Sequence, residues 1–167
     1  MNDRLTAILA RVEKPSRYVG GEWNQIKKNF DETPVRYALA FPDVYEVGMS
    51  HLGLKIIYHE INRRDDALAE RVYAPWPDME KALREENYPL YGIESFSPLM
   101  NYDLIGFALL YEMNASNILT MLNLAQLPLR AIDRTDEMPF VLAGGPCVCN
   151  IEPMADFFDF ALFGEGE

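Results

Sequence analysis

Side chains able to bind a flat ligand recur in this sequence directly after segments that have the composition of buried strands. These positions are Asp43-Val44-Tyr45, Trp76, Tyr111-Glu112, Gly144-Gly145-Pro146 and Gly164-Glu165-Gly166. Glycine at the end of a strand allows close approach of a backbone or a ligand, and aromatic rings supply flat apolar walls. The carboxyl ends of parallel strands meet at one edge of a sheet. The pattern therefore predicts a binding site for a planar ligand at that edge.

The longest of these segments is FPDVYEVGMSHLG, residues 41–53. It follows an apolar run over residues 35–41 and precedes residues 51–63, whose apolar positions recur with helical spacing. Open α/β sheets usually hold their ligand at a glycine-containing loop between a strand and a helix, because the helix begins with unpaired N–H groups. We therefore expect an open loop here, around which the rest of the chain is organised.

Apolar runs alternate with helical periodicity from residue 34 onward. Predicted strands cover 35–41, 69–74, 103–110, 139–143 and 159–163, and predicted helices cover 51–63, 78–87, a segment capped by Asn114 or Ser116, and 153–157. Strands joined by helix-length connections indicate a parallel sheet with both faces covered. Five such strands with right-handed crossovers favour a flavodoxin-like α/β fold with strand order 2-1-3-4-5.

The first 33 residues lack this alternation. Residues 2–13 have the periodicity of a short helix, and residues 17–33 are predicted to be an irregular arm packed on the domain. Residues 88–102 are predicted to be a loop-rich insert. We thus expect a helix and an irregular lead-in over residues 1–33, followed by one α/β domain over residues 34–167.

Composition limits the class of protein. The chain has 167 residues, a formal net charge of −11 and two cysteines. No run approaches the roughly 18 apolar residues of a membrane-spanning helix, and the amino terminus is too polar for a secretory signal. The negative charge disfavours nucleic acid and anionic membranes as partners, and the cysteine content predicts no disulfide framework. We expect a cytoplasmic protein.

Several common catalytic motifs are absent from the sequence. It contains no phosphate-binding P-loop, no dinucleotide fingerprint after the first strand and no nucleophile elbow. His51 and His59 are predicted to cap a helix or face solvent, and Cys147 and Cys149 to be small buried residues rather than metal ligands. The glutamates of the closing GEGE are candidates for acid/base chemistry, with a solvated chain end as the alternative. We assign no catalytic residue and no metal ligand.

From about residue 35 onward, the chain resembles the cobalamin-binding-type domain that precedes the catalytic barrel of many radical SAM proteins. More narrowly, it resembles an uncharacterised radical SAM family, through the segments FPDVYEVGMSHLG, DLIGFALLYEMN, LAGGP and GEGE in this order. The resemblance implies that a barrel with a 4Fe-4S cluster and S-adenosylmethionine follows residue 167, and that this barrel is the partner of the present domain. It also implies that this segment alone has no complete active site.

The resemblance further implies a cofactor site for cobalamin. Asp43, Gly48 and the pair Gly144-Gly145 match the motif of the fold, whereas Tyr45 stands where that fold has its cobalt-ligating histidine. Ala108 stands where the fold has a serine, and the leucine of that motif is retained. A phenol is a poor cobalt ligand, so cobalamin would bind base-off, without a protein ligand from that side. The implied site comprises Asp43, Tyr45, Gly48, Met49, Ala108, Leu110, Tyr111, Gly144, Gly145 and Pro146.

Two other functions fit the same residues. A degenerate domain would keep the fold, lose cobalamin and act as a substrate-recognition or interaction module of the radical SAM protein; the departures at Tyr45 and Ala108 favour it. A free-standing flavodoxin-like protein would bind FMN. Against this function, the sequence has no Ser/Thr-rich phosphate loop after the first strand, where Asp43 and Glu46 would instead repel phosphate.

Overall fold

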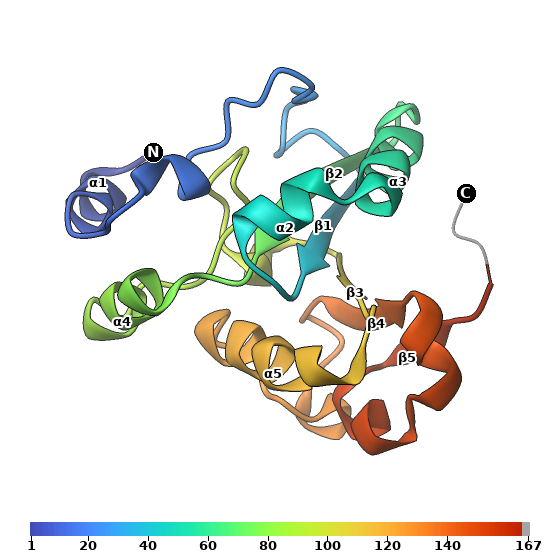
Figure 1. Ribbon diagram of the computed structural model, residues 1–167. Helices are drawn as coiled ribbons and strands as arrows, with labels where there is room; N and C mark the ends of the chain where they lie inside the picture. Colours follow the sequence, from blue (N-terminus) through green and yellow to red (C-terminus); the bar gives the residue numbers. More distant parts are fainter. Residues whose placement is uncertain (165–167) are drawn as a thin grey trace.

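A five-stranded parallel sheet forms the centre of the protein (Figure 1). The computed structural model describes residues 1–164. The strand order is β2-β1-β3-β4-β5, and every neighbouring pair is parallel, which confirms the flavodoxin-like order expected from the sequence. The strands are β1 (Val35–Phe41), β2 (Ala67–Tyr73), β3 (Leu104–Ala108), β4 (Phe140–Gly144) and β5 (Phe160–Leu162).

Helices connect the strands within the described residues. The α-helices are α1 (Asp3–Leu9), α2 (Tyr45–Ser50), α3 (Leu52–Asn62), α4 (Pro77–Glu85) and α5 (Ala115–Leu124). Short 3-10 helices are η1 (Pro15–Tyr18), η2 (Leu99–Asn101), η3 (Glu112–Asn114), η4 (Ala131–Asp133), η5 (Pro146–Asn150) and η6 (Glu152–Phe157). Among these described helices, none is long and apolar enough to cross a membrane.

The sheet separates two apolar clusters. On one face, α1, α4 and α5 pack against strand residues that include Ala38, Ile105 and Val141. On the other face, α3 packs against residues that include Leu39 and Ala69. Figure 1 shows α1 and α4 on one side of the sheet and α3 on the other. Successive strand residues alternate between the clusters, as expected for a sheet buried on both sides.

The sequence-based expectation of an open loop between β1 and α3 is wrong for residues 45–50. Tyr45–Ser50 form the helix α2, which contains Gly48 in its interior. Glycine there disfavours a helix by roughly 1 kcal/mol relative to alanine. Tertiary packing outweighs this preference, because Gly48 is buried directly against the ring of Tyr73.

Element boundaries differ from the predicted ones for identifiable reasons. Strand β3 ends at Ala108 rather than at residue 110, because its partner β4 ends where Gly145 adopts a φ of +111°. Strand β2 begins at Ala67, two residues earlier than predicted, because it pairs there with Val35. Helix α3 begins at Leu52, and His51 serves as its cap.

Within residues 1–164 the outer edge of β2 has no neighbouring strand, yet backbone groups along it are hydrogen-bonded. Asn62, at the end of α3, donates from Nδ2 to the Ala69 carbonyl at 3.0 Å and accepts from the Ala69 N–H at Oδ1, also at 3.0 Å. Further along the edge, the Ile93 N–H donates to the Arg71 carbonyl at 3.0 Å. Lys28 donates to the Ala67 carbonyl at 2.6 Å. Side chains and loop backbone thus replace the missing strand.

The lead-in is irregular, as predicted, and side-chain contacts attach it to the domain. Arg17 in η1 forms an ion pair with Glu46 of α2 at 2.7 Å, and its guanidinium lies over the Trp76 ring, 4.6 Å from the ring centroid. The Ile26 N–H donates to Tyr58 Oη at 2.9 Å. The arm therefore lies along α2, α3 and the outer edge of β2.

Replacing Asn62 by alanine is expected to destabilise the protein by about 2–4 kcal/mol. The change removes the hydrogen bonds to Ala69 and leaves its N–H and carbonyl buried without partners, which costs more than an exposed bond. Denaturant unfolding would measure the loss. Asn123, which is exposed and accepts one bond from Arg84, is the matched control, and N123A should stay within about 0.5 kcal/mol. Equal effects of the two substitutions would contradict this account of the β2 edge.

Candidate functional site

The predicted site residues lie at the carboxyl ends of the strands, where α2 crosses the end of β2. The carbonyl of Pro42, just after β1, accepts hydrogen bonds from Nδ2 of Asn117 at 2.9 Å and of Asn114 at 3.3 Å. These bonds join the end of β1 to the start of α5. The edge is therefore one continuous surface built by β1, β2, β3 and the segments that follow them.

Gly48 does not border an open crevice. A Cβ atom placed on Gly48 would lie 2.3 Å from Cε1 of Tyr73 and 3.1 Å from Cδ1 of Phe41. The ring of Tyr73 therefore occupies the space that the absent side chain leaves. A cofactor tail entering beside Gly48 would need this ring to move.

Met49 points toward the same ring. The Tyr73 hydroxyl donates to Met49 Sδ at 2.9 Å, and Arg71 Nη1 lies 3.5 Å from the same sulfur. Burial raises the pKa of Tyr73, so its phenol is neutral at physiological pH. Met49 thus takes part in the packing below α2.

Tyr45 occupies the position that the cobalamin-binding resemblance gives to a metal ligand. Its ring meets that of Tyr73 edge-on, with centroids 5.5 Å apart, and its hydroxyl donates to the carboxylate of Glu22 in the lead-in. Burial, together with the bond to Glu22, raises the pKa of Tyr45 to about 12. The phenol is therefore neutral and already hydrogen-bonded to Glu22 of the lead-in, which makes it a still weaker ligand for a metal ion.

Asp43 shapes the turn between β1 and α2. Its carboxylate Oδ1 accepts from the N–H of Val44 at 2.7 Å, and its carbonyl accepts from the N–H of Ala74 at 3.0 Å. Both bonds are local or run to the end of β2. Asp43 therefore positions α2 against β2.

The remaining predicted residues belong to β3, β4 and their ends. Ala108 and Leu110 pack against the apolar cluster below α3. Gly145 lies against the end of β3, because a Cβ there would be 2.9 Å from the Leu109 carbonyl. Beside Gly144, by contrast, no atom lies within 4 Å of where a Cβ would be.

At three of the four strand-end positions that would line a cobalamin tail, neighbouring protein atoms occupy the adjacent space. The ring of Tyr73 occupies the space beside Gly48, Ala108 is partly buried against the cluster below α3, and Gly145 lies against the backbone of Leu109. Only Gly144 faces open space among these four positions of residues 1–164. The residues present therefore do not fit the nucleotide tail without rearrangement.

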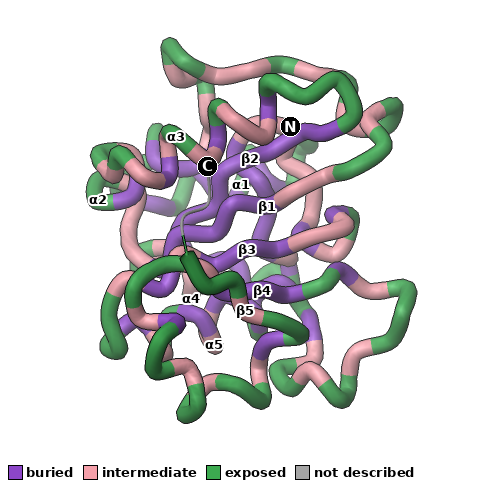
Figure 2. The backbone as a smooth tube through the Cα atoms, turned by 90° about the vertical axis from the view of Figure 1, so that its right-hand side faces the viewer, coloured by how far each residue is buried: buried purple, intermediate pink, exposed green. Residues whose placement is uncertain are grey.

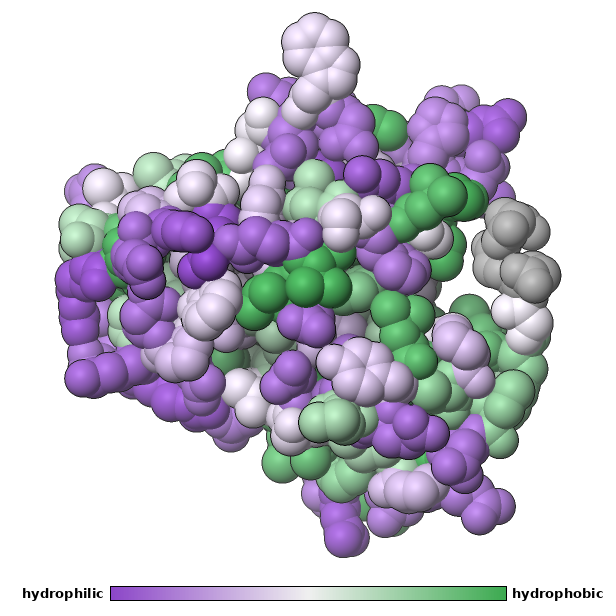
Figure 3. All heavy atoms as spheres, in the orientation of Figure 1, coloured by the Kyte–Doolittle hydropathy of each residue, from purple (hydrophilic) through white to green (hydrophobic). Residues whose placement is uncertain are grey.

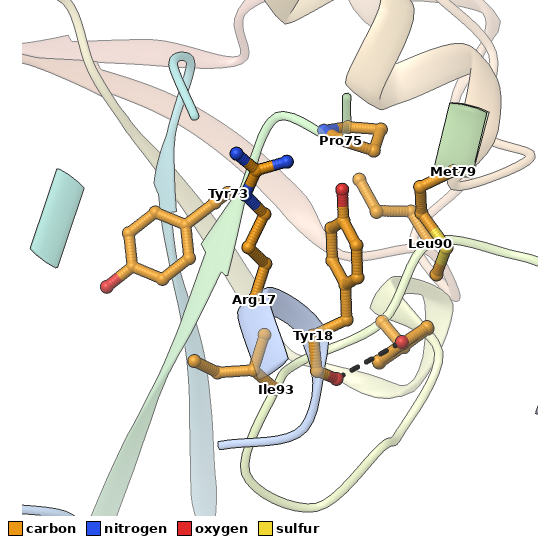
Figure 4. A pocket seen from close by; sticks show the side chains of 8 residues that line it. Arg17, Tyr18, Tyr73, Pro75, Met79, Leu90 and Ile93 are labelled. Carbon is orange, nitrogen blue, oxygen red and sulfur yellow. Dashed lines mark hydrogen bonds between the residues drawn. The ribbon is translucent and has the colours of Figure 1, made fainter. Parts of the chain in front are cut away.

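Two hollows lie elsewhere in the described part of the chain. One is a small pocket of about 10 Å³ between η1, α4 and the end of β2, lined by Tyr18, Tyr73, Met79 and others (Figure 4). It has room for about one water molecule. The other is an open hollow of about 420 Å³ between the lead-in and residues 94–96. Neither is lined by the glycines of the strand ends.

His51 caps α3, as predicted, because its Nδ1 accepts from the N–H of Leu54 at 3.1 Å. The prediction that both cysteines are buried is wrong for Cys149, which is exposed, whereas Cys147 is partly buried. Both residues belong to the 3-10 helix η5, and Cys147 packs against the cluster below α4 and α5. Residues 1–164 contain no cluster of three or more side chains suited to hold a metal ion. Glu165 and Glu167 lie outside the described residues.

Exposed apolar side chains lie on the segments that follow the strand ends, and the sequence did not predict their exposure. Val47 of α2 is 46% exposed, Leu52 of α3 is 69% exposed, and Met113 of η3 is 81% exposed. Tyr111, predicted as a cofactor contact, is also 45% exposed. Figure 3 is drawn in the same orientation as Figure 1, in which α2 and the start of α5 face the viewer, and it shows green hydrophobic side chains among purple ones on this side. We call Val47, Leu52, Tyr111 and Met113 the apolar rim.

A buried ion pair lies below α2, beside the edge. Arg71 Nε donates to Glu94 Oε1 at 2.6 Å, and the backbone N–H of Arg71 donates to Glu94 Oε2 at 2.8 Å. The two side chains are 2% and 3% exposed. The guanidinium lies over Tyr58, 4.5 Å from the ring centroid, and its Nη2 has no partner among the described residues. The sequence signals this buried charge by placing two charged residues, Glu70 and Arg71, inside the otherwise apolar strand ALAERVY.

Burial raises the pKa of Glu94 to about 7, because loss of hydration outweighs the attraction of Arg71. A carboxyl whose pKa is higher in the folded than in the unfolded chain stabilises the fold most below its unfolded pKa. This stabilisation disappears as the pH rises through about 7. Between about pH 5 and pH 8, the free energy of unfolding of the native chain should therefore fall by roughly 2–3 kcal/mol more than that of E94Q. Urea unfolding at both pH values would measure it, and parallel pH profiles of the two proteins would contradict it.

The family described as radical SAM proteins, N-terminal, matches residues 53–167. An uncharacterized protein of Methanocaldococcus jannaschii is 24% identical over 131 residues, which cover 78% of this chain and 24% of that protein. The chain thus spans about a quarter of the length of this curated relative. Since the family match covers well over half of the chain, the protein belongs to the radical SAM proteins, in the region that forms their amino-terminal part.

Proposed function

We propose that this chain is the amino-terminal module of a radical SAM protein and that it binds the catalytic part of that protein through the apolar rim. The observation that carries the proposal is the exposure of Val47, Leu52 and Met113 around the carboxyl ends of the strands. Exposed apolar side chains that gather on one face of a protein are typical of interaction surfaces. In open α/β sheets this is also the edge that faces ligands and partners.

The catalytic part is expected in the remainder of the longer protein. The relative from Methanocaldococcus jannaschii is about four times as long as the region that matches this chain. Membership of the radical SAM family favours a 4Fe-4S cluster and S-adenosylmethionine as the source of radical chemistry in that remainder. In this proposal the present chain positions the catalytic part or its substrate.

We further infer that the domain has kept the cobalamin-binding fold but uses its edge for protein contact. The packing of Tyr73 against Gly48 and the engagement of Tyr45 by Glu22 favour this function over cofactor binding. Base-off binding of cobalamin at Asp43, Gly48, Gly144 and Gly145 stays a prediction. It would require Tyr73 to leave the position beside Gly48.

Charging the rim is expected to weaken contact with the catalytic part without unfolding the domain. Met113 is exposed, so M113E should change the stability of residues 1–167 by no more than about 0.5 kcal/mol. In the full-length protein, M113E should speed proteolysis between the two parts and slow reductive cleavage of S-adenosylmethionine. Ile132, 88% exposed on the connection that enters β4, is the matched control. If I132E and M113E have equal effects, the rim is not the contact surface.

A titration with hydroxocobalamin, followed by visible absorbance under anaerobic conditions, separates the two functions of the edge. We expect no saturable spectral change for either residues 1–167 or the full-length protein, because the ring of Tyr73 fills the site. A saturable change to a base-off spectrum in the full-length protein, weakened by G144W beside the open space at Gly144, would overturn the proposed loss of cobalamin.

A further inference from the structure

The part of one sheet face over β4 and β5 has no helix over it in the described residues. Helix α3 packs against β1 and β2, in the cluster that contains Leu39 and Ala69. The same face continues over β3, β4 and β5. Figure 2 looks toward this side, and no helix lies in front of β3 and β4, whereas Figure 1 shows α4 on the opposite side of the sheet.

Strand register identifies the side chains on the uncovered part. Val141 and Ala143 point into the cluster below α4 and α5, so Phe140 and Leu142 point the other way. Leu142 pairs with Phe160, and Gly144 pairs with Leu162, which places these residues on the same face. Leu142 is only 3% exposed, so the residues around it already cover it, and the exposed surface lies over Phe140 and β5. The exposed members are Phe140 (53%), Phe160 (42%) and Leu162 (52%), and the rings of Phe140 and Phe160 are 6.3 Å apart. We call these three residues the open strip.

The open strip begins where the covered part ends. The side chain of Tyr37, on β1, extends over β3, because a Cβ on Gly106 would lie 2.0 Å from the Tyr37 hydroxyl oxygen. Tyr37 thus shields the bare backbone of Gly106, and beyond it the apolar side chains face outward. The open strip is therefore a continuation of a buried face, and no described charged residue of β4 or β5 interrupts it.

We propose that an amphipathic helix from the remainder of the full-length radical SAM protein docks along the open strip. A parallel sheet buries both faces, and the covering elements are helices. Strands β3, β4 and β5 span about 10 Å across the sheet, which matches the width of one helix. The helix would present apolar side chains at i, i+3, i+4 and i+7 to Phe140, Phe160 and Leu162.

The length of the relative supports an occupant from the same protein. In the Methanocaldococcus jannaschii protein, the region matching this chain is 24% of the whole, so about three quarters of that protein is available to cover the sheet. The open strip lies on a side face, whereas the apolar rim lies at the strand ends. The inference rests on the proposed function, because it takes the rest of the radical SAM protein as the partner.

The test compares one substitution in two chains. F160E should lower the melting temperature of the full-length protein by about 5 °C or more, because it buries a charge beneath the docked helix. In residues 1–167 alone, where Phe160 is partly exposed, F160E should change the melting temperature by less than about 2 °C and reduce binding of a hydrophobic dye. I132E, the matched control at an exposed isoleucine, should have small effects in both chains.

Equal small effects of F160E in both chains would overturn the inference, since the open strip would then be exposed in the full-length protein. A dimer of residues 1–167 that F160E dissociates, seen by analytical ultracentrifugation and persisting in the full-length protein, would assign the strip to a second copy and also overturn it. Failure of the proposed function has a different signature. A full-length protein that assembles no iron–sulfur cluster would refute the radical SAM partner, whatever F160E does.

Discussion

The contact between Tyr73 and Gly48 determines how the strand-end edge is built. Tyr73 ends β2, and its ring lies against the backbone of α2 at the one position where a side chain is absent. The same ring meets Tyr45 edge-on, and its hydroxyl binds Met49. A segment that would otherwise be a flexible loop over the sheet edge is thereby held as a helix. The edge consequently presents the outer side of α2 to solvent, in place of a crevice.

Charged residues inside β2 explain the role of the lead-in. Arg71 and Glu94 are almost fully buried, and burying them requires that nearly every polar atom finds a partner. Asn24 in the lead-in accepts from Arg71 at 3.3 Å, and Glu22 accepts from Tyr45. The arm therefore contributes polar partners to the buried groups below α2 in addition to covering the β2 edge. This makes the irregular segment before β1 an integral part of the domain.

The fold was largely predictable from the sequence, but the site was predictable only as a location. Buried runs such as DLIGFALL and the spacing of apolar residues in α3 and α5 are local patterns that predict strands and helices. The preference for right-handed crossovers then predicts the strand order. Whether Gly48 borders a crevice depends on Tyr73, a residue 25 positions away, and no local pattern reports that contact. For the same reason, the pairing of Arg71 with Glu94 and the exposure of Met113 were not foreseen.

The two apolar surfaces have different physical origins, which bears on how the domain fits into a larger protein. The apolar rim consists of side chains on helices and turns at the strand ends, where each could be polar without disturbing the core. The open strip consists of strand residues whose neighbours Val141 and Ala143 are fully buried on the reverse side. A strand with one buried face tolerates polar residues on the other, yet Phe140, Phe160 and Leu162 are apolar. The exposure of apolar side chains at these positions is the observation that supports the proposed docking of a further helix.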